Sequence, residues 1–293
     1  DRLRAMRLFP HWAKARAVAK GTDGRAFAVT AWGWSARDTA DAQAQAETRA
    51  RLAAQKLAAG GTGGHYGYLE RPLREEELDR TDDAAGRTQV AVTRNGYGAR
   101  ILNAADAMFV DVDLPASGAL ETLVWRLTRM FSRETPSPRA RHEAAALALL
   151  EPLAKRDPVF GARVYRTCAG LRYLVTHRTA DPEAEETLAT MRALRADPLY
   201  IKLTRAQACF RARLTPKPWR VGLPEPRERW PWRDSATEGA FREWERRYQA
   251  ASVGHATCAF MTTVGNPAID PALVPVVERH DRETAAASGL PLA

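Results

Sequence analysis

The chain has 293 residues, of which 45% are hydrophobic and 27% are charged. This composition supports a large buried core and excludes a disordered polyelectrolyte, and no apolar run approaches the ~18 residues that cross a bilayer, so no membrane partner is expected. Lysine and arginine total 44 against 35 acidic residues, a formal net charge of +9. The excess favours a phosphate-bearing partner, a nucleic acid or a nucleotide, although an alanine- and arginine-rich chain is also typical of a GC-rich genome.

The cysteines and histidines argue against a disulfide-bonded or zinc-bound fold. Cys168, Cys209 and Cys258 are odd in number and widely spaced, which predicts free thiols and a reducing, cytoplasmic location. No CxxC or HxxxH spacing suggests zinc. The pair His280-Asp281 would need further histidines nearby to bind a metal. The sequence does not indicate an oligomeric state.

The first part of the chain, 1–103, is expected to be an N-terminal α/β module. Its predicted elements are two strands (16–20 and 25–32) around the turn GTDG, a helix capped by Ser35 or Asp38 that runs to about Leu57, a GGTGG hinge at 60–64, and two strands (88–95 and 99–103) around NGYG. Alternating apolar residues, helix caps and Asn-Gly turns carry these assignments. Residues 66–78 show no clear period.

The second part, 104–220, has the element order β–α–β–β–α–β of an RRM-like unit. The predicted elements are a strand at 107–114, helices at 119–131 and 139–155, strands at 162–167 and 171–177, helices at 181–194 and 198–207, and a strand at 209–215. The third part, 221–293, is expected to brace the other two with a helix at 237–251, a strand at 256–264 and a helix at 271–286. The predicted fold class is therefore α+β.

The usual strand order of such a unit, 4-1-3-2, places the strand 107–114 at the centre of the sheet. Side chains alternate between the two faces of a strand, so Asp111 and Asp113 share one face, which is expected to be open while the helices cover the other. Arg172 on one neighbour and Arg211 and Arg213 on the other are expected to lie beside them. Two carboxylates ~6–7 Å apart suit a divalent ion, and arginines suit phosphates. The alternative is a structural network of ion pairs, because Asp-x-Asp is a common string.

These residues resemble the archaeo-eukaryotic primase and primase-polymerase superfamily. MFVDVD at 108–113 is similar to the first catalytic motif of these enzymes, and the segment around AGLRYLVT is similar to the second, with Arg172 where they carry a nucleotide-binding histidine. FRARLTPKP matches their third region loosely, through Arg211, Arg213 and Lys217, and lacks its acid. The resemblance covers 107–220 and implies an RRM-like catalytic half beside an N-terminal α/β half. The whole chain also looks like a family of bacterial proteins of similar length, which implies no activity.

The expected function is divalent-metal-dependent nucleotidyl or phosphoryl transfer on nucleic acid or nucleotides, in a cleft between the first two parts. Mg²⁺ or Mn²⁺ is the expected cofactor, held by Asp111 and Asp113, with Arg172 as a third catalytic residue. The expected phosphate or nucleic-acid contacts are Arg163, Arg166, Arg211, Arg213, Lys217, Trp219 and Arg220. Two alternatives stay open: a non-catalytic basic nucleic-acid-binding protein, and a metal-dependent nuclease.

Overall fold

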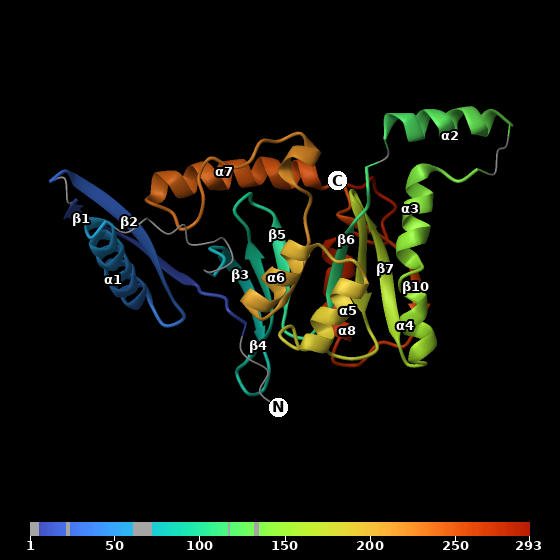
Figure 1. Cartoon of the computed structure of the whole chain (residues 1–293), viewed down its shortest axis with the longest axis horizontal. Coiled ribbons are helices and arrows are strands. Elements are labelled where there is room, and N and C mark those ends of the chain that lie inside the picture. The colour runs from blue at the N-terminus through green and yellow to red at the C-terminus, as the bar shows by residue number, and fades with distance from the viewer. Residues whose placement is uncertain (1–5, 22–23, 61–71, 117, 132–134) are drawn as a thin grey trace.

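A computed structural model describes residues 6–21, 24–60, 72–116, 118–131 and 135–293. Two four-stranded sheets and a separate two-stranded hairpin, all antiparallel, are combined with helices in this α+β fold (Figure 1). The mixed content confirms the predicted class. None of the described helices combines the length and the apolar character that a membrane span needs. Most of the GGTGG motif lies in 61–71, outside the described residues.

The N-terminal unit consists of β1 (His11–Lys20), β2 (Ala26–Ser35) and α1 (Thr39–Ala58). Both strands are longer than expected. The side chain of Asp38 caps α1 by accepting a hydrogen bond from the backbone nitrogen of Asp41, at 2.7 Å. The buried face of α1 is made of alanines: Ala42, Ala46, Ala50 and Ala54. Such small side chains let the helix lie close to the hairpin.

The first sheet has the order β3-β4-β5-β9. Its strands are β3 (Glu76–Asp82), β4 (Thr88–Arg94), β5 (Arg100–Ala104) and β9 (Phe210–Arg213). The turn between β4 and β5 forms as predicted, with Gly98 at φ +89° and the Asn95 side chain accepting from the nitrogens of Tyr97 and Ala99. β3 was not predicted, because it is a polar edge strand with no apolar alternation.

The second sheet has the order β10-β7-β8-β6. Its strands are β6 (Phe109–Asp113), β7 (Gly161–Thr167), β8 (Gly170–Val175) and β10 (Cys258–Gly265). The expected arrangement of β6, β8 and β7 is present. The expected pairing of the strand at 209–215 with the strand at 107–114 is wrong, since β9 pairs with β5 instead. β6 is therefore an edge strand of its hydrogen-bonded ladder.

Tyr200 accounts for the missing ladder between β6 and β9. Its hydroxyl lies 3.0 Å from the carbonyl oxygens of Phe109 and Arg211, and it accepts from the backbone nitrogen of Arg211 at 3.1 Å. The backbone nitrogen of Asp197 also donates to the carbonyl of Asp111, at 3.3 Å. These contacts take backbone groups that a strand pair would use, and satisfied groups need no further partner.

The helices follow the predicted order with two corrections. They are α2 (Ala119–Phe131), α3 (Pro138–Leu147), α4 (Glu151–Arg156), α5 (Glu185–Ala193), α6 (Pro198–Gln207), the 3₁₀ helix η1 (Pro218–Val221), α7 (Ser235–Ser252) and α8 (Val274–Glu283). The helix expected over 139–155 is broken in two, with Pro152 in the first turn of α4. The helix expected from Asp181 begins at Glu185, because the Asp181 side chain closes a turn onto the nitrogen of Glu183 at 2.8 Å.

The core lies on both faces of the second sheet. On one face the Tyr173 hydroxyl donates to the carbonyl of Ala146 in α3, at 3.0 Å. On the other face His280 of α8 packs on Phe109 and Tyr165, with ring centroids 5.2 and 4.7 Å apart. This second face was expected to be open, and α8 covers it. Each sheet also takes strands from more than one of the three expected parts, since β9 joins the first sheet and β10 joins the second.

Candidate functional site

Asp111 and Arg172 face each other across β6 and β8, as predicted, and form a bidentate ion pair. Arg172 Nε and Nη2 donate to Asp111 Oδ1 and Oδ2 at 2.7 and 3.0 Å. The Arg172 side chain is 1% exposed, whereas that of Asp111 is 38% exposed. Burial opposes ionisation of Asp111, but the guanidinium beside it prevails and holds its pKa below the ordinary value. Asp111 is thus a charged group that solvent reaches from one side.

The other terminal nitrogen of Arg172 is also engaged. Its Nη1 donates to the carbonyl of Arg213 at 3.0 Å and lies 3.3 Å from Nε2 of His280. Because a guanidinium only donates, Nε2 accepts, and Nδ1 carries the proton toward Asp281 at 3.0 Å. Burial and the nearby Arg172 charge hold the pKa of His280 below its ordinary value. Arg172 therefore ties β8 to β6, β9 and α8, and its donors are used within the protein.

Cys258, His280 and Asp281 lie in the order of a catalytic triad, with a thiol, an imidazole and a carboxylate in sequence. The thiol and the imidazole are buried, so a substrate has no access to them. The Cys258 sulfur lies 3.9 Å from His280 Nε2. Cys258 and His280 are both fully buried, and burial raises the pKa of the thiol. With Nε2 already accepting from Arg172, this group cannot take a proton from sulfur. The cluster is structural.

Three other arginines expected to bind phosphate are paired with carboxylates. Arg163 donates to Asp281 at 2.6 Å and Arg166 to Glu143 at 2.7 Å. Arg211 is buried and grips both oxygens of Glu75, at 2.8 and 2.9 Å. An arginine already paired with a carboxylate has less charge to offer a phosphate.

A cleft of about 440 Å³ lies where β6 and β9 approach each other, between the two sheets. The residues that line it include Trp12, Arg74, Glu75, Tyr97, Asp111, Tyr200, Arg211, Arg213, Glu225 and Arg229. Each carboxylate in this lining already has an arginine partner: Asp111 with Arg172, Glu75 with Arg211, and Glu225 with Arg229. These pairs also engage two of the lining arginines, Arg211 and Arg229, so the acids are neutralised and Arg213 is left without a carboxylate partner among the described residues.

Arg213 is the residue of this cleft that is best placed to bind an anion. It comes from the end of β9 and is half-buried. Its buried Nε has no hydrogen-bond partner in the described parts of the chain, and no described carboxylate forms an ion pair with it. Its charge helps to lower the pKa of Asp111, so the two side chains interact electrostatically. A buried donor without an acceptor is costly, and a bound anion would relieve that cost.

Trp219 and Lys217 lie beside the cleft rather than in its lining, and Arg220, the next residue of η1, is not in the lining either. The Trp219 ring, 49% exposed, makes an edge contact with the ring of Tyr97 at 5.5 Å. Lys217 Nζ lies 5.4 Å from the Trp219 ring. Because Tyr97 does line the cleft, these residues extend its rim by one aromatic ring and one cation.

Asp113 does not share the position of Asp111. It is exposed, is paired in register with Gly170, and is not among the described residues that line the cleft. The described residues contain no cluster of three or more histidine, cysteine, aspartate or glutamate side chains arranged to hold a metal ion. The geometry thus brings Asp111 to the cation-rich cleft and leaves Asp113 outside it.

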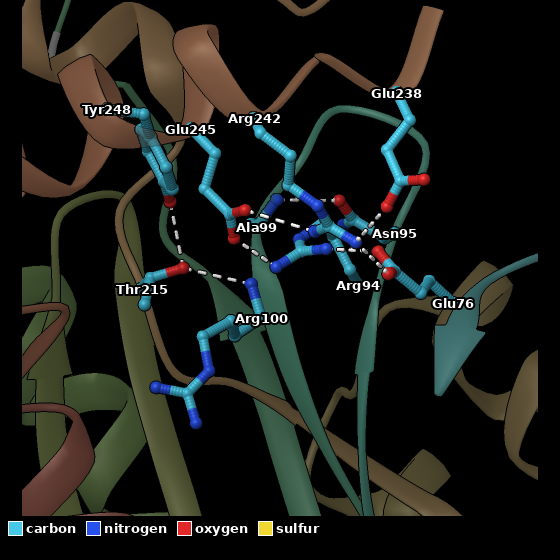
Figure 2. Close-up of polar contacts among 10 residues, drawn as sticks. All are labelled: Glu76, Arg94, Asn95, Ala99, Arg100, Thr215, Glu238, Arg242, Glu245 and Tyr248. Atoms are coloured by element: carbon cyan, nitrogen blue, oxygen red, sulfur yellow. Dashed lines mark hydrogen bonds and ion pairs between the residues drawn. The ribbon is translucent and has the colours of Figure 1, made fainter. Parts of the chain in front are cut away.

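The wall of the cleft around Asn95 is braced by α7 (Figure 2). Arg94, buried at the end of β4, forms ion pairs with Glu76 of β3 and Glu245 of α7. Arg242 of α7 adds pairs to Glu76 and Glu245, at 2.8 and 3.1 Å. Sequence reasoning missed this network and the role of Glu75, because partners far apart in the chain give no local signal. The run of three glutamates at 75–77 is the one local sign of it in the sequence.

Comparison with family models, with curated proteins and with solved structures found no match to this chain. Any function must therefore be argued from the cleft itself.

Proposed function

We propose that the cleft beside Asp111 binds a phosphate-bearing ligand, a nucleotide or a nucleic-acid strand. The observation that carries this proposal is Arg213, a half-buried cation in the lining whose Nε lacks a hydrogen-bond partner among the described residues. A guanidinium offers two parallel donors, which match the oxygens of a phosphate. Lining acids that are already paired do not repel such a ligand.

The aromatic residues of the cleft support a base-bearing ligand. Tyr97 lines it and is half-buried, and the exposed Trp219 continues the rim. Aromatic rings next to cations are the usual means of holding single-stranded nucleic acids, by stacking and charge. The volume of about 440 Å³ is in the range of small-molecule sites.

The test is nucleotide binding by calorimetry with the full chain and a nucleoside triphosphate, without metal. Arg213→Gln is expected to weaken binding at least tenfold, since one charge-assisted pair contributes roughly 1.5–3 kcal/mol. Lys202→Gln is the matched control, because Lys202 is exposed on α6 and does not line the cleft. Equal affinity of Arg213→Gln and the unaltered protein would refute the proposal.

Metal-dependent transfer is the second candidate, and one observation favours it. The Asp111 carboxylate stays ionised and keeps 38% of its side chain exposed, beside Arg213. A primase-polymerase-like reaction would use it with Asp113, and the adjacent order of β6, β8 and β7 agrees with that proposal.

Incubation of labelled RNA and DNA with nucleotides and Mn²⁺ separates the candidates. Longer products indicate transfer, shorter products indicate a nuclease, and a shifted complex alone indicates binding. If transfer occurs through these acids, Asp111→Asn with Asp113→Asn abolishes it and leaves metal-free nucleotide binding in place. Activity that survives both substitutions rules this mechanism out.

A further inference from the structure

The face of the β1–β2 hairpin that points away from α1 carries basic, apolar and hydroxyl side chains and no acidic ones. We call it the ribbon face. It consists of Lys14, Arg16, Val18 and Lys20 of β1 opposite Trp32, Thr30, Ala28 and Ala26 of β2. Neither strand contains an acidic residue. The alternating pattern KARAVAK sends each cation outward and each alanine toward α1.

The cations of the ribbon face are available. Lys14, Arg16 and Lys20 are exposed, and none forms an ion pair with a described residue. Two of them lie opposite small residues, Arg16 opposite Thr30 and Lys20 opposite Ala26, so no large neighbour blocks the approach of a partner. An array of one sign without counter-charges is poised to bind a polyanion.

The hairpin also has the shape for such a partner. It stands clear of the two sheets at one end of the molecule (Figure 1). Ten residues in each strand give a length of about 33 Å, and two strands lie ~4.8 Å apart. The major groove of B-DNA, ~12 Å wide, admits a two-stranded ribbon of this kind. The major groove of an RNA duplex is too deep and narrow.

Tryptophan packing joins the base of the ribbon to the cleft. Trp12 packs against Trp34 with ring centroids 5.4 Å apart, and Trp12 lines the cleft. Arg74 also lines the cleft, and its guanidinium lies 4.0 Å from the Trp32 ring. The ribbon face is thus continuous with the cleft, and a polyanion on one is directed toward the other.

We propose that the ribbon face docks into the major groove of duplex DNA, with Lys14, Arg16 and Lys20 on the phosphates. This surface adjoins the cleft but its three cations are not in the cleft lining, and the proposed duplex binding goes beyond the nucleotide binding proposed for the cleft. The chemistry is mainly electrostatic, because the small residues of β2 offer few hydrogen bonds to base edges, and only Thr30 and the cations can reach them. Binding is therefore expected to depend weakly on sequence and steeply on salt.

The test measures fluorescence anisotropy of a labelled 20-base-pair DNA duplex with the full chain from 50 to 200 mM salt. The combined variant Lys14→Gln, Arg16→Gln and Lys20→Gln is expected to weaken binding at least tenfold at 100 mM salt. Its logarithmic salt slope should be shallower by about 3, because each lost phosphate contact removes ~0.9. All three side chains are exposed, so folding should be unchanged, and circular dichroism checks this.

The control removes three positive charges elsewhere: Arg51→Gln, Lys56→Gln and Lys202→Gln, which are exposed on α1 and α6. It should retain most of the affinity and slope. The proposal is overturned if both combined variants lose affinity equally, if the unaltered protein does not bind the duplex at 50 mM salt, or if duplex RNA or vesicles of anionic phospholipid are bound as tightly as DNA. Loss of nucleotide binding in Arg213→Gln reports on the cleft alone, so the two proposals fail independently.

Discussion

At the scale of single residues, Arg172 organises the region around the candidate site. A fully buried guanidinium is tolerated only when its charge and donors are matched, and Asp111, the carbonyl of Arg213 and His280 supply the match. The same contacts orient the Asp111 carboxylate at the cleft and fix the backbone of Arg213. A residue expected to touch phosphate thus positions two residues that line the cleft.

Replacing Arg172 with methionine is expected to lower the free energy of unfolding by about 3–5 kcal/mol, the usual cost of breaking a buried ion pair. Asp111→Asn should cost a similar amount, about 3 kcal/mol, because it leaves the fully buried guanidinium of Arg172 without a charged partner. The double variant should cost less than the sum of the two, since neither charge is then left alone. Urea unfolding of the four proteins measures this coupling, and additive costs within ~0.5 kcal/mol would contradict it.

At the scale of elements, α7 is held to the first sheet by a network of ion pairs and by one close contact. Arg94 and Arg242 share Glu76 and Glu245 between β3, β4 and α7 (Figure 2). A Cβ on Gly98 would lie 2.3 Å from the ring of Trp244, so the turn packs directly against the helix. The helix therefore sets the position of the turn at 95–98, which forms part of the cleft wall.

The two arginines of this network are expected to differ in their contribution to stability. The Arg94 side chain is 8% exposed. Its loss removes one ion-pair partner from each of two carboxylates, those of Glu76 and Glu245, which are 13% and 14% exposed. Arg94→Met should therefore lower the free energy of unfolding by about 3 kcal/mol. The Arg242 side chain is 40% exposed, where solvent screens its pairs, so Arg242→Met should cost less than about 1 kcal/mol. Chemical denaturation compares them, and equal costs would show that burial does not govern this network.

At the scale of the whole molecule, the sequence predicts most elements and fewer of their partnerships. The strands at β1, β2, β4 and β8 carry apolar alternation and turn residues, which are local signals. The position of Arg172 beside Asp111 on a neighbouring strand also followed from the predicted order of strands, whereas their exact register comes from the structure. Three features were not predicted: the pairing of β9 with β5, the packing of α8 over one face of the second sheet, and the polar strand β3. They depend on contacts between distant segments, such as the contact of Tyr200 with the edge of β6. No periodicity encodes those contacts.

The N-terminal unit should open independently of the two sheets. The extensive contacts of β1, β2 and α1 among the described elements are with one another, and Ala15, Ala46 and Ala50 form a small core of their own. Alanines bury little apolar area, so this unit has less hydrophobic stabilisation than the core around β6 and β8. Amide exchange of α1 is expected to be faster than that of β8, as for other weakly packed units.

Gly33 provides the means to test this independence. A Cβ at Gly33 would lie 2.0 Å from the carbonyl oxygen of Ala42 and 2.4 Å from the nitrogen of Ala46, both backbone atoms. Gly33→Ala should therefore force α1 away from β2 and speed amide exchange throughout the unit, while β4 and β8 keep their protection. Gly239→Ala is the matched control, since nothing lies within 4 Å of its added Cβ in α7. Faster exchange in β8 to the same degree as in α1 would show that the hairpin unit and the two sheets unfold together.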